Sequence, residues 1–259
     1  MVPGVAFLLT DVDPSITATL LGVAMLGAWA AGWSWGQYLH KGGHEERQTK
    51  LDEGLLTLLG LLLAFTFSMS LAKHDQRRQM LVVDSNSIGD FYTCASLLKE
   101  PVRGKLRAVL REYVELRLSA ASPSLDEAEL QHKLEETQNQ HNAMQALVQE
   151  AVDAGTPVVV PLVNTLNEVT SSHAARLSAG RDRLPPNVVL LLCLVALAAM
   201  ALNGRHPGIT GRPRVGAAVG FSVMVALVLW VTLDLNQPHR GWIIVSQEPL
   251  QRLLQGMGK

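Results

Sequence analysis

The sequence has little cysteine, little aromatic content and little charge. Among 259 residues there are two cysteines, Cys94 and Cys193, and neither stands in a metal-ligand spacing. Cys193 lies in an apolar run and Cys94 in the polar middle of the chain, so a disulfide between them is not expected. Charged residues make up 17% of the chain and give a formal net charge of −1. In the polar stretch 73–184, 15 acidic residues outnumber 13 basic ones, which excludes a basic nucleic-acid-binding surface there.

The motifs of common enzyme sites are also absent. There is no glycine-rich phosphate loop, no nucleophile elbow and no zinc-protease motif. His40 and His44 are four residues apart, but Gly42 and Gly43 lie between them and disfavour a helix that presents both rings to a metal. We therefore expect no catalytic residue, no metal ion and no cofactor, and we expect that the protein is not an enzyme.

Long apolar runs are the dominant feature that is present. Four of them hold 17 to 25 residues each, and Asp234 is the one charged residue among them: 15–39, 54–72, 187–203 and 215–235. At about 1.5 Å per residue such helices cover the roughly 30 Å hydrocarbon core of a bilayer. Residues 1–14 contain no Lys or Arg, so the first run lacks the basic start of a cleaved signal peptide. The sequence predicts four transmembrane helices in contact with lipid.

The runs form two pairs on either side of a polar insertion. The insertion, residues 73–184, holds 13 Lys or Arg and 15 Asp or Glu, and its apolar residues recur at helical spacing. We expect helices over 73–98, 102–119 and about 125–153, and a further helix that ends at Arg183. The prediction is an all-α membrane protein with four segments: a first helix pair (1–72), a helical extramembrane domain (73–184), a second helix pair (185–235) and a C-terminal tail that docks on the domain (236–259). Arg117, within 102–119, is taken as a surface charge of this domain.

The distribution of basic residues predicts the orientation. Near the membrane ends, one side has six Lys or Arg and the other has nine, and the excess marks the cytoplasmic side. The six are Lys41, Arg47, Lys50, Arg205, Arg212 and Arg214, and the nine are Lys73, Arg77, Arg78, Arg176, Arg181, Arg183, Arg240, Arg252 and Lys259. We expect the insertion and both termini to be cytoplasmic.

The membrane runs carry faces of small residues that allow helices to approach closely. Gly60, Ala64 and Ser68 are spaced by four in the second run. The first run has Ala28, Gly32 and Gly36 at the same spacing, and the fourth has Gly216 and Gly220. These residues predict helix packing and no particular function.

A polar stripe occupies another face of the second run. Its members are Thr66, Ser70, Lys73 and Arg77, at helical steps of four, three and four. One interpretation is the lining of a water-filled pore with a cationic mouth. The other is that Thr66 and Ser70 bond their own helix carbonyls and the two basic residues mark the membrane interface. Phe65 and Phe67 beside the stripe either form a hydrophobic constriction or face lipid.

The fourth run ends in a structural anchor. Asp234 is costly to bury without a partner, and Pro238 ends the helix. Gly241 permits a turn, after which "GWIIV" reads as an extended piece and "SQEPLQRLL" as the start of a short helix capped by Ser246. We expect a cation, Arg240 or Lys73, to pair with Asp234, and prefer this anchoring role to direct handling of ions by its carboxylate.

Three blocks of the chain resemble the bestrophin-like family of bacterial membrane proteins. They are "LLLAFTFSMSLAKHDQRRQMLVVDSNSIGDFY" (61–92), "LVNTLNEVTSSHAARLSAGRDRLPPNVVLLL" (162–192) and "LDLNQPHRGWIIVSQEPL" (233–250). The run "AFTFSMSLAKHDQRR" is also similar in character to the pore helix of true bestrophins, which are homopentameric anion channels. That resemblance implies a neck near Phe65, Phe67 and Ser68 and an inner mouth at Lys73. The sequence departs from bestrophins in having "KHDQRR" and no Trp after this helix, and no acidic cluster for calcium.

Two functions remain as hypotheses. The resemblance implies a homo-oligomeric ion channel of the bacterial inner membrane, a pentamer or else a tetramer, with chloride as the candidate ion. The cationic residues of the polar stripe favour anions. The alternative is a membrane scaffold or sensor that conducts nothing and binds a partner through its helical domain.

Overall fold

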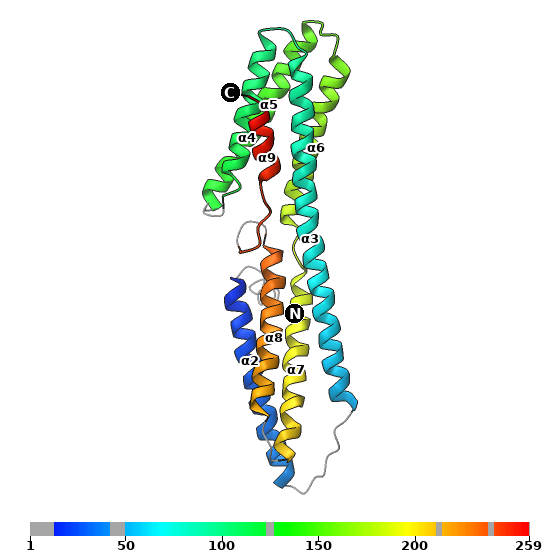
Figure 1. Ribbon diagram of the computed structural model, residues 1–259, viewed down its shortest axis with the longest axis vertical. Coiled ribbons are helices and arrows are strands. Elements are labelled where there is room, and N and C mark those ends of the chain that lie inside the picture. Colours follow the sequence, from blue (N-terminus) through cyan, green and yellow to red (C-terminus); the bar gives the residue numbers. More distant parts are fainter. Residues whose placement is uncertain (1–12, 42–49, 123–126, 211–213, 238–240, 259) are drawn as a thin grey trace. The chain divides into compact units, whose positions relative to one another are not determined.

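The computed structural model describes residues 13–41, 50–122, 127–210, 214–237 and 241–258, and in these residues the only regular secondary structure is helical. The helices are α2 (Pro14–Lys41), α3 (Lys50–Ser96), α4 (Val102–Ser119), α5 (Glu127–Asp153), α6 (Val159–Arg181), α7 (Pro186–Thr210), α8 (Val215–Asn236) and α9 (Glu248–Gly256) (Figure 1). The all-α prediction is confirmed for this part of the chain. The segment "GWIIV" forms bends and irregular backbone, without a strand.

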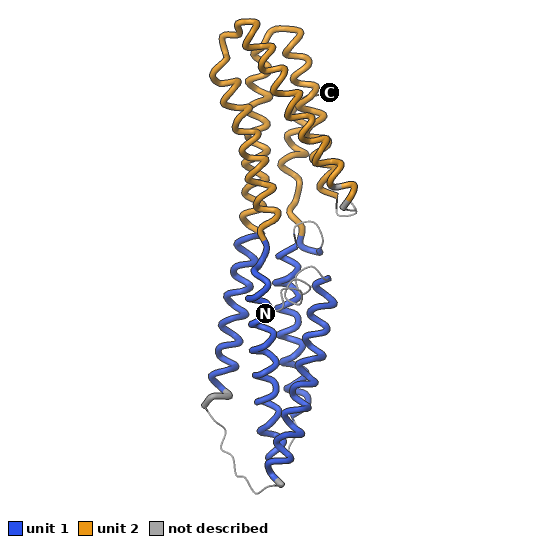
Figure 2. The backbone as a smooth tube through the Cα atoms, turned by 180° about the vertical axis from the view of Figure 1, so that it is seen from behind, with its two compact units in different colours: residues 1–73, 183–237, 241–243 blue, residues 74–182, 238–240, 244–259 orange. Residues whose placement is uncertain are grey.

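The chain divides into two compact units, which Figure 2 colours separately. Unit 1 comprises residues 1–73, 183–237 and 241–243, and unit 2 comprises 74–182, 238–240 and 244–259. Helix α3 begins in the first unit and ends in the second. Each unit is described separately below.

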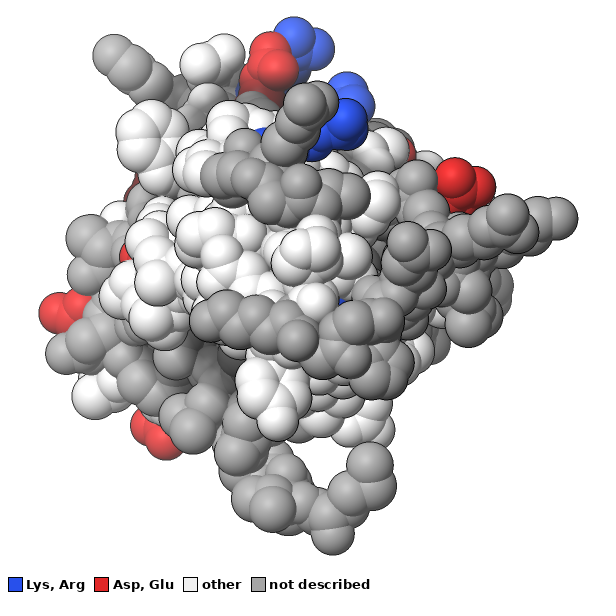
Figure 3. All heavy atoms as spheres, turned by 90° about the horizontal axis from the view of Figure 1, so that it is seen from below, with Lys and Arg blue, Asp and Glu red and all other residues white. Residues whose placement is uncertain are grey.

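Unit 1 contains the apolar parts of four helices that are long and apolar enough to cross a membrane, as the sequence predicts. The four candidate spans are Pro14–His40, Glu53–Ser96, Val159–Ile209 and Val215–Asn236. Helix α2 packs along α7 and α8 (Figure 1). Met25, Leu59, Leu192 and Leu229 bring one side chain from each of the four helices into a shared apolar core. In the end view of Figure 3, most of the described atoms are uncharged.

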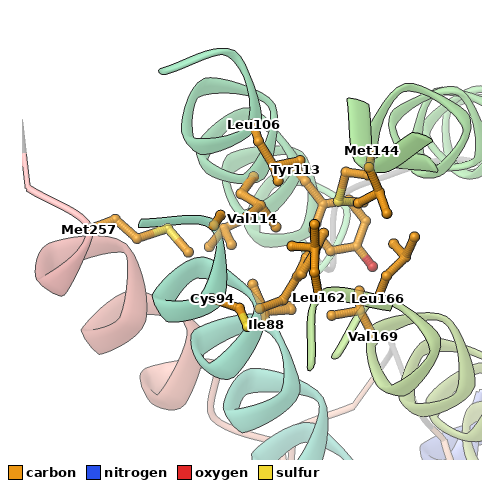
Figure 4. Packing of buried hydrophobic residues seen from close by; sticks show 14 of the residues in the cluster. Ile88, Cys94, Leu106, Tyr113, Val114, Met144, Leu162, Leu166, Val169 and Met257 are labelled. Atoms are coloured by element: carbon orange, nitrogen blue, oxygen red, sulfur yellow. The ribbon is translucent and has the colours of Figure 1, made fainter. Parts of the chain in front are cut away.

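Unit 2 is built around an apolar core of its own. Its buried side chains come from α3, α4, α5, α6 and α9, and Figure 4 shows them meeting between the helices. Tyr113 lies at the centre with no exposed surface. Helix α9 packs on α4 and contributes Leu250 to the core. The tail is bonded to α3 as well, because the Tyr92 hydroxyl donates to the Met257 carbonyl at 2.7 Å.

One helix start differs from the expectation. Helix α9 begins at Glu248 with Gln247 in the N-cap position, where Ser246 was expected. The hydroxyl of Ser246 still accepts a hydrogen bond from the Glu248 N–H at 3.3 Å. Pro249 stands within the first turn of α9, where its missing N–H removes no helix bond.

Candidate functional site

Within unit 1, one face of α3 is buried in the core and the opposite face is exposed. Leu59, Thr66 and Ser70 are buried, and they recur at helical spacing along the side that meets the other helices. The opposite side, here called the outward face, consists of exposed residues: Gly60, Leu61, Ala64, Ser68, Leu71 and Ala72, flanked by Phe65 and Phe67. Phe65 is 60% exposed and Phe67 36%. The outward face is open to lipid, to another chain or to water.

Thr66 and Ser70 of the polar stripe are thus inside the single chain. The Thr66 hydroxyl donates to the carbonyls of Leu62 and Leu63 in its own helix, at 2.9 and 3.0 Å. The Ser70 hydroxyl instead crosses to α8 and donates to the Thr232 carbonyl at 2.8 Å. Both hydroxyls are satisfied by backbone carbonyls, which is how polar groups are accommodated in an apolar bundle. Pore lining by this pair stays a prediction, and it would require α3 to turn away from these partners.

The two basic members of the stripe belong to different units and have different surroundings. Lys73 is half-buried. Arg77 is 6% exposed, and its guanidinium donates to the carbonyls of Ala179 at 3.3 Å and Asp182 at 3.2 Å. These carbonyls lie at the C-terminal end of α6, where helix carbonyls lack intrahelical partners and a cation is favourable. Arg77 therefore caps the C-terminal end of α6 through its side chain.

The close helix contact within unit 1 involves glycines of α2 and α7. A Cβ atom added to Gly32 would overlap the Ala201 carbonyl, and one added to Gly204 would overlap the Trp29 carbonyl. Gly36 and Gly208 are placed in the same way, each against backbone of the facing helix. The α7 glycines were missed from the sequence, although their spacing of four was a usable signal. By contrast, Gly60, Gly216 and Gly220 have open space around them, and Ala64 and Ser68 are exposed, so packing of these faces stays a prediction for contacts between chains.

Asp234 holds the chain segment that follows α8. Its carboxylate is 2% exposed and accepts the N–H of Trp242, at 3.0 Å to both oxygens, and the N–H of Ile243 at 2.9 Å. Gly241 has a φ of 135°, in the region that favours glycine. The partners that the structure describes are backbone N–H groups, where the sequence led us to expect a cation. Pro238 and Arg240, the other predicted anchor residues, lie outside the described residues.

Asn236, which the sequence did not single out, makes a second bond at the same end of α8. Its side-chain oxygen accepts the N–H of Leu184 at 2.7 Å, and Asn236 is 1% exposed. Leu184 precedes α7, so this bond ties the end of α8 to the start of α7. No sequence pattern indicates such a pairing, because the two residues are 52 positions apart.

Unit 2 contains a buried polar cluster centred on the Asp84 carboxylate of α3. Arg117 of α4 donates to it at 2.6 Å, Arg176 of α6 at 3.1 Å and the Ser172 hydroxyl at 3.3 Å. Arg176 also donates to the side-chain oxygen of Gln247 in the tail, at 3.1 Å. The cluster therefore joins α3, α4, α6 and the C-terminal segment. Two guanidinium groups face one carboxylate, which makes the cluster net positive.

The position of Arg117 corrects one expectation. Arg117 was taken as a surface charge, but it is 5% exposed, and it also bonds the Tyr113 hydroxyl and Nδ1 of His173. The signal was present in the sequence, since Arg117 continues the apolar helical spacing of 102–119. A neighbouring ring, His141, lies 5.1 Å from Tyr113 and 5.0 Å from His173, measured between ring centroids. Burial, and next the charge of Arg117, lower the pKa of His141 below 6.5.

These features define an α-helical protein with four candidate membrane spans and a second, polar-centred helical unit. Among the described residues, no group of three or more His, Cys, Asp or Glu could hold a metal ion. The family model of the Bestrophin-like domain matches residues 19–250. The chain belongs to the bestrophin-like family, which in general terms indicates a membrane channel. No curated protein and no solved structure matches the chain.

Proposed function

We propose that the protein is a homo-oligomeric membrane channel that conducts ions and favours anions. In this proposal unit 1 spans the bacterial inner membrane as two helix pairs, and the helical region 73–184 and both termini lie in the cytoplasm. The observation that carries the proposal is the outward face of α3 in a chain of the bestrophin-like family. Copies of α3 around a common axis would cover this face with one another and leave a path between them.

The outward face supplies the parts that such a path needs. Its centre holds small residues, Ala64 and Ser68, which leave room for an ion and offer a hydroxyl. Phe65 and Phe67 on its two flanks are exposed and can narrow the path, where an apolar constriction gates by dewetting. The proposal thus places Phe65, Phe67 and Ser68 in the neck. On the opposite side of α3, Ser70 donates to α8, and Thr66 bonds carbonyls of its own helix.

Charge near the end of this path decides the preferred ion. Lys73 is assigned to the mouth, and a ring of lysines raises the local concentration of anions such as chloride. Asp75 is exposed and continues the spacing of Ala64 and Ser68 along α3. Because the two residues have opposite effects on ions, substitutions at each should shift selectivity in opposite directions.

The test is ion flux through liposomes that contain the purified full-length protein. We expect a chloride-preferring flux that Phe65→Ala increases, because a smaller side chain widens and wets the constriction. Lys73→Glu should shift the preference towards cations, and Asp75→Asn should strengthen the preference for anions. Lys99→Glu is the matched control: it reverses the same charge at an exposed position near the far end of α3. It should leave selectivity unchanged, because screening acts within about 8 Å at physiological salt.

The outcomes separate the two candidate functions. Absence of flux from folded protein under voltage, pH and osmotic gradients contradicts conduction and favours the scaffold or sensor, whose helical domain would bind a partner through unit 2. Flux that responds to none of the three substitutions would mean that ions pass elsewhere than along α3.

A further inference from the structure

The loop Gly241–Ile243, which follows α8 in the sequence, is held in a fixed position within unit 1. The buried Asp234 carboxylate accepts two consecutive backbone N–H groups of the loop, those of Trp242 and Ile243. Hydrogen bonds to an ionised acceptor are stronger than neutral ones. A Cβ on Gly241 would lie 2.7 Å from Asp234 Oδ1, so only glycine allows the loop to come this close. Specific hydrogen bonds and a required glycine therefore fix the conformation of this loop.

The side chains that this fixed loop carries are apolar and exposed. Trp242 is 83% exposed and Ile243 is 37% exposed. Tryptophan is enriched at interfaces, including those of membranes, where one part of the side chain meets apolar and the other aqueous surroundings. Its indole ring combines an apolar body with one N–H donor, a combination that suits a boundary between apolar and aqueous surroundings.

The neighbours of Trp242 show that it lies where two candidate spans end. Its ring is 6.4 Å from that of Trp230, edge to face. The Trp230 indole N–H in turn donates to the Ser15 hydroxyl at 3.2 Å. Ser15 is in the first turn of α2, and Trp230 is in the last two turns of α8. The start of α2 and the last two turns of α8 therefore meet near this aromatic pair.

The exposed apolar surfaces of α2 and α8 both extend to the Ser15–Trp230 contact. On α2, the exposed residues Ile16, Leu20 and Val23 begin next to Ser15. On α8, Val223 and Leu227 are more than half exposed, and their helical spacing continues to Trp230. An apolar outer surface that ends in tryptophan is the pattern of a lipid-facing helix at the membrane interface.

We propose that the Trp242 loop is a lipid-interface anchor, and that Asp234 is the residue that positions it. The occupant of its exposed surface is the headgroup–acyl boundary of the bilayer, into which the indole of Trp242 and the side chain of Ile243 insert. The anchor fixes the depth at which α8 ends and the tail begins. It requires unit 1 to span the membrane as proposed, and it does not depend on conduction.

The test uses Trp fluorescence of the full-length protein in phosphatidylcholine vesicles. The difference in emission between the parent and Trp242→Phe isolates Trp242. We expect this signal to be quenched by lipids with a nitroxide at a shallow acyl position, less by a nitroxide at the bilayer centre, and little by aqueous acrylamide. Dominant quenching by acrylamide would place Trp242 in water and overturn the proposal. Resistance to every quencher would mean that protein, such as a second copy of the chain, covers it, and would also overturn it.

The positioning role of Asp234 is tested separately. Asp234→Asn keeps the size of the side chain but removes its charge, and each variant is measured with its own Trp242→Phe partner. We expect the shallow nitroxide to lose its quenching of Trp242 and acrylamide to gain it. If Asp234→Asn does not fold, Gly241→Ala takes its place. An added Cβ would push the loop away from Asp234, so we expect the same change in quenching. Unchanged quenching in a folded variant would remove Asp234 from this role, whatever the flux assay shows.

Discussion

Buried charge at single residues distinguishes unit 2 from an ordinary helical bundle. Asp84 has no exposed surface and binds two guanidinium groups, so removing its carboxylate would leave the charges of Arg117 and Arg176 uncompensated. Such a loss costs about 3–5 kcal/mol in comparable buried pairs. The exposed pair Lys105–Glu150, at 3.1 Å, belongs to a class that contributes about 0–1 kcal/mol. The packing of α3, α4 and α6 against one another therefore depends more on Asp84 than on surface ion pairs.

His141 makes the stability of unit 2 sensitive to acid. Its Nε2 atom is buried and has no hydrogen-bond partner in the described part of the chain. The charged and titratable groups near its ring are Tyr113 and Arg117 of α4, Asp84 of α3 and His173 of α6, and Arg176 of α6 acts in turn on His173. Because its folded-state pKa lies below 6.5, the unfolded chain binds the proton first. The stability is complete above pH 6.5 and falls as the pH drops from 6.5 towards the folded-state pKa.

We expect His141→Phe to reduce this loss of stability and to raise the melting temperature at neutral pH. Phenylalanine keeps an aromatic ring beside Tyr113 and removes both the proton site and the unsatisfied nitrogen. The measurement is the melting temperature of the protein in detergent between pH 7.5 and 5. His132→Phe, at an exposed position of the same helix, is the control and should retain the parent profile. An unaltered pH profile in His141→Phe would show that other groups cause the acid sensitivity.

At the scale of elements, backbone contact between α2 and α7 holds unit 1 together. Gly32 and Gly204 bring the two helices so close that backbone faces backbone, which gives dispersion contacts without large side chains. A carbonyl cannot move aside as the end of a flexible side chain can. The interface is therefore intolerant of even one added carbon atom.

We expect Gly32→Ala and Gly204→Ala each to lower the free energy of unfolding by about 1–3 kcal/mol, which is the usual cost of overpacking a helix contact. Gly27→Ala is the matched control on α2, because nothing lies within 4 Å of a Cβ at that position. It should be neutral or slightly stabilising, since alanine favours helix more than glycine does. The comparison is made by denaturant unfolding in detergent. Equal destabilisation by Gly27→Ala and Gly32→Ala would contradict the close contact.

The sequence predicts which residues form helices better than it predicts which groups those helices contact. Apolar runs almost without charge predict the four candidate membrane spans, because the length of such a run can be compared with the thickness of a bilayer. The stripe from Thr66 to Arg77 was visible too, but periodicity does not say whether a polar face meets water or another helix. In the folded single chain, Ser70 of this stripe donates to the Thr232 carbonyl of α8, a partner that periodicity could not indicate. The partners of Asp234 are backbone N–H groups, which carry no sequence signal.

At the scale of the whole molecule, one exposed face still needs a partner. The outward face of α3 holds Ala64 and Ser68, whose size suits close approach of another helix, and Phe65, which is 60% exposed. On α8, Val223 is also exposed, but its neighbours on that face lead to the Trp230–Trp242 pair, which we assign to lipid. In an oligomer built around α3, the outward face of α3 meets the same face of neighbouring copies, whereas the Val223 face of α8 does not.

We therefore expect Ser68→Cys to be cross-linked between chains and Val223→Cys not to be cross-linked. The chain with its two native cysteines is the background, and each variant adds one thiol, so cross-linking by a short bifunctional maleimide yields covalent dimers. Dimers should form in vesicles at low protein-to-lipid ratio, where random collisions are rare. The mass of the intact complex, measured by light scattering with the detergent contribution subtracted, then tells a pentamer from a tetramer. Stronger cross-linking at Val223 than at Ser68 would place α8 at the contact between chains, and both the α3 pore and the lipid assignment of the α8 surface would have to be abandoned.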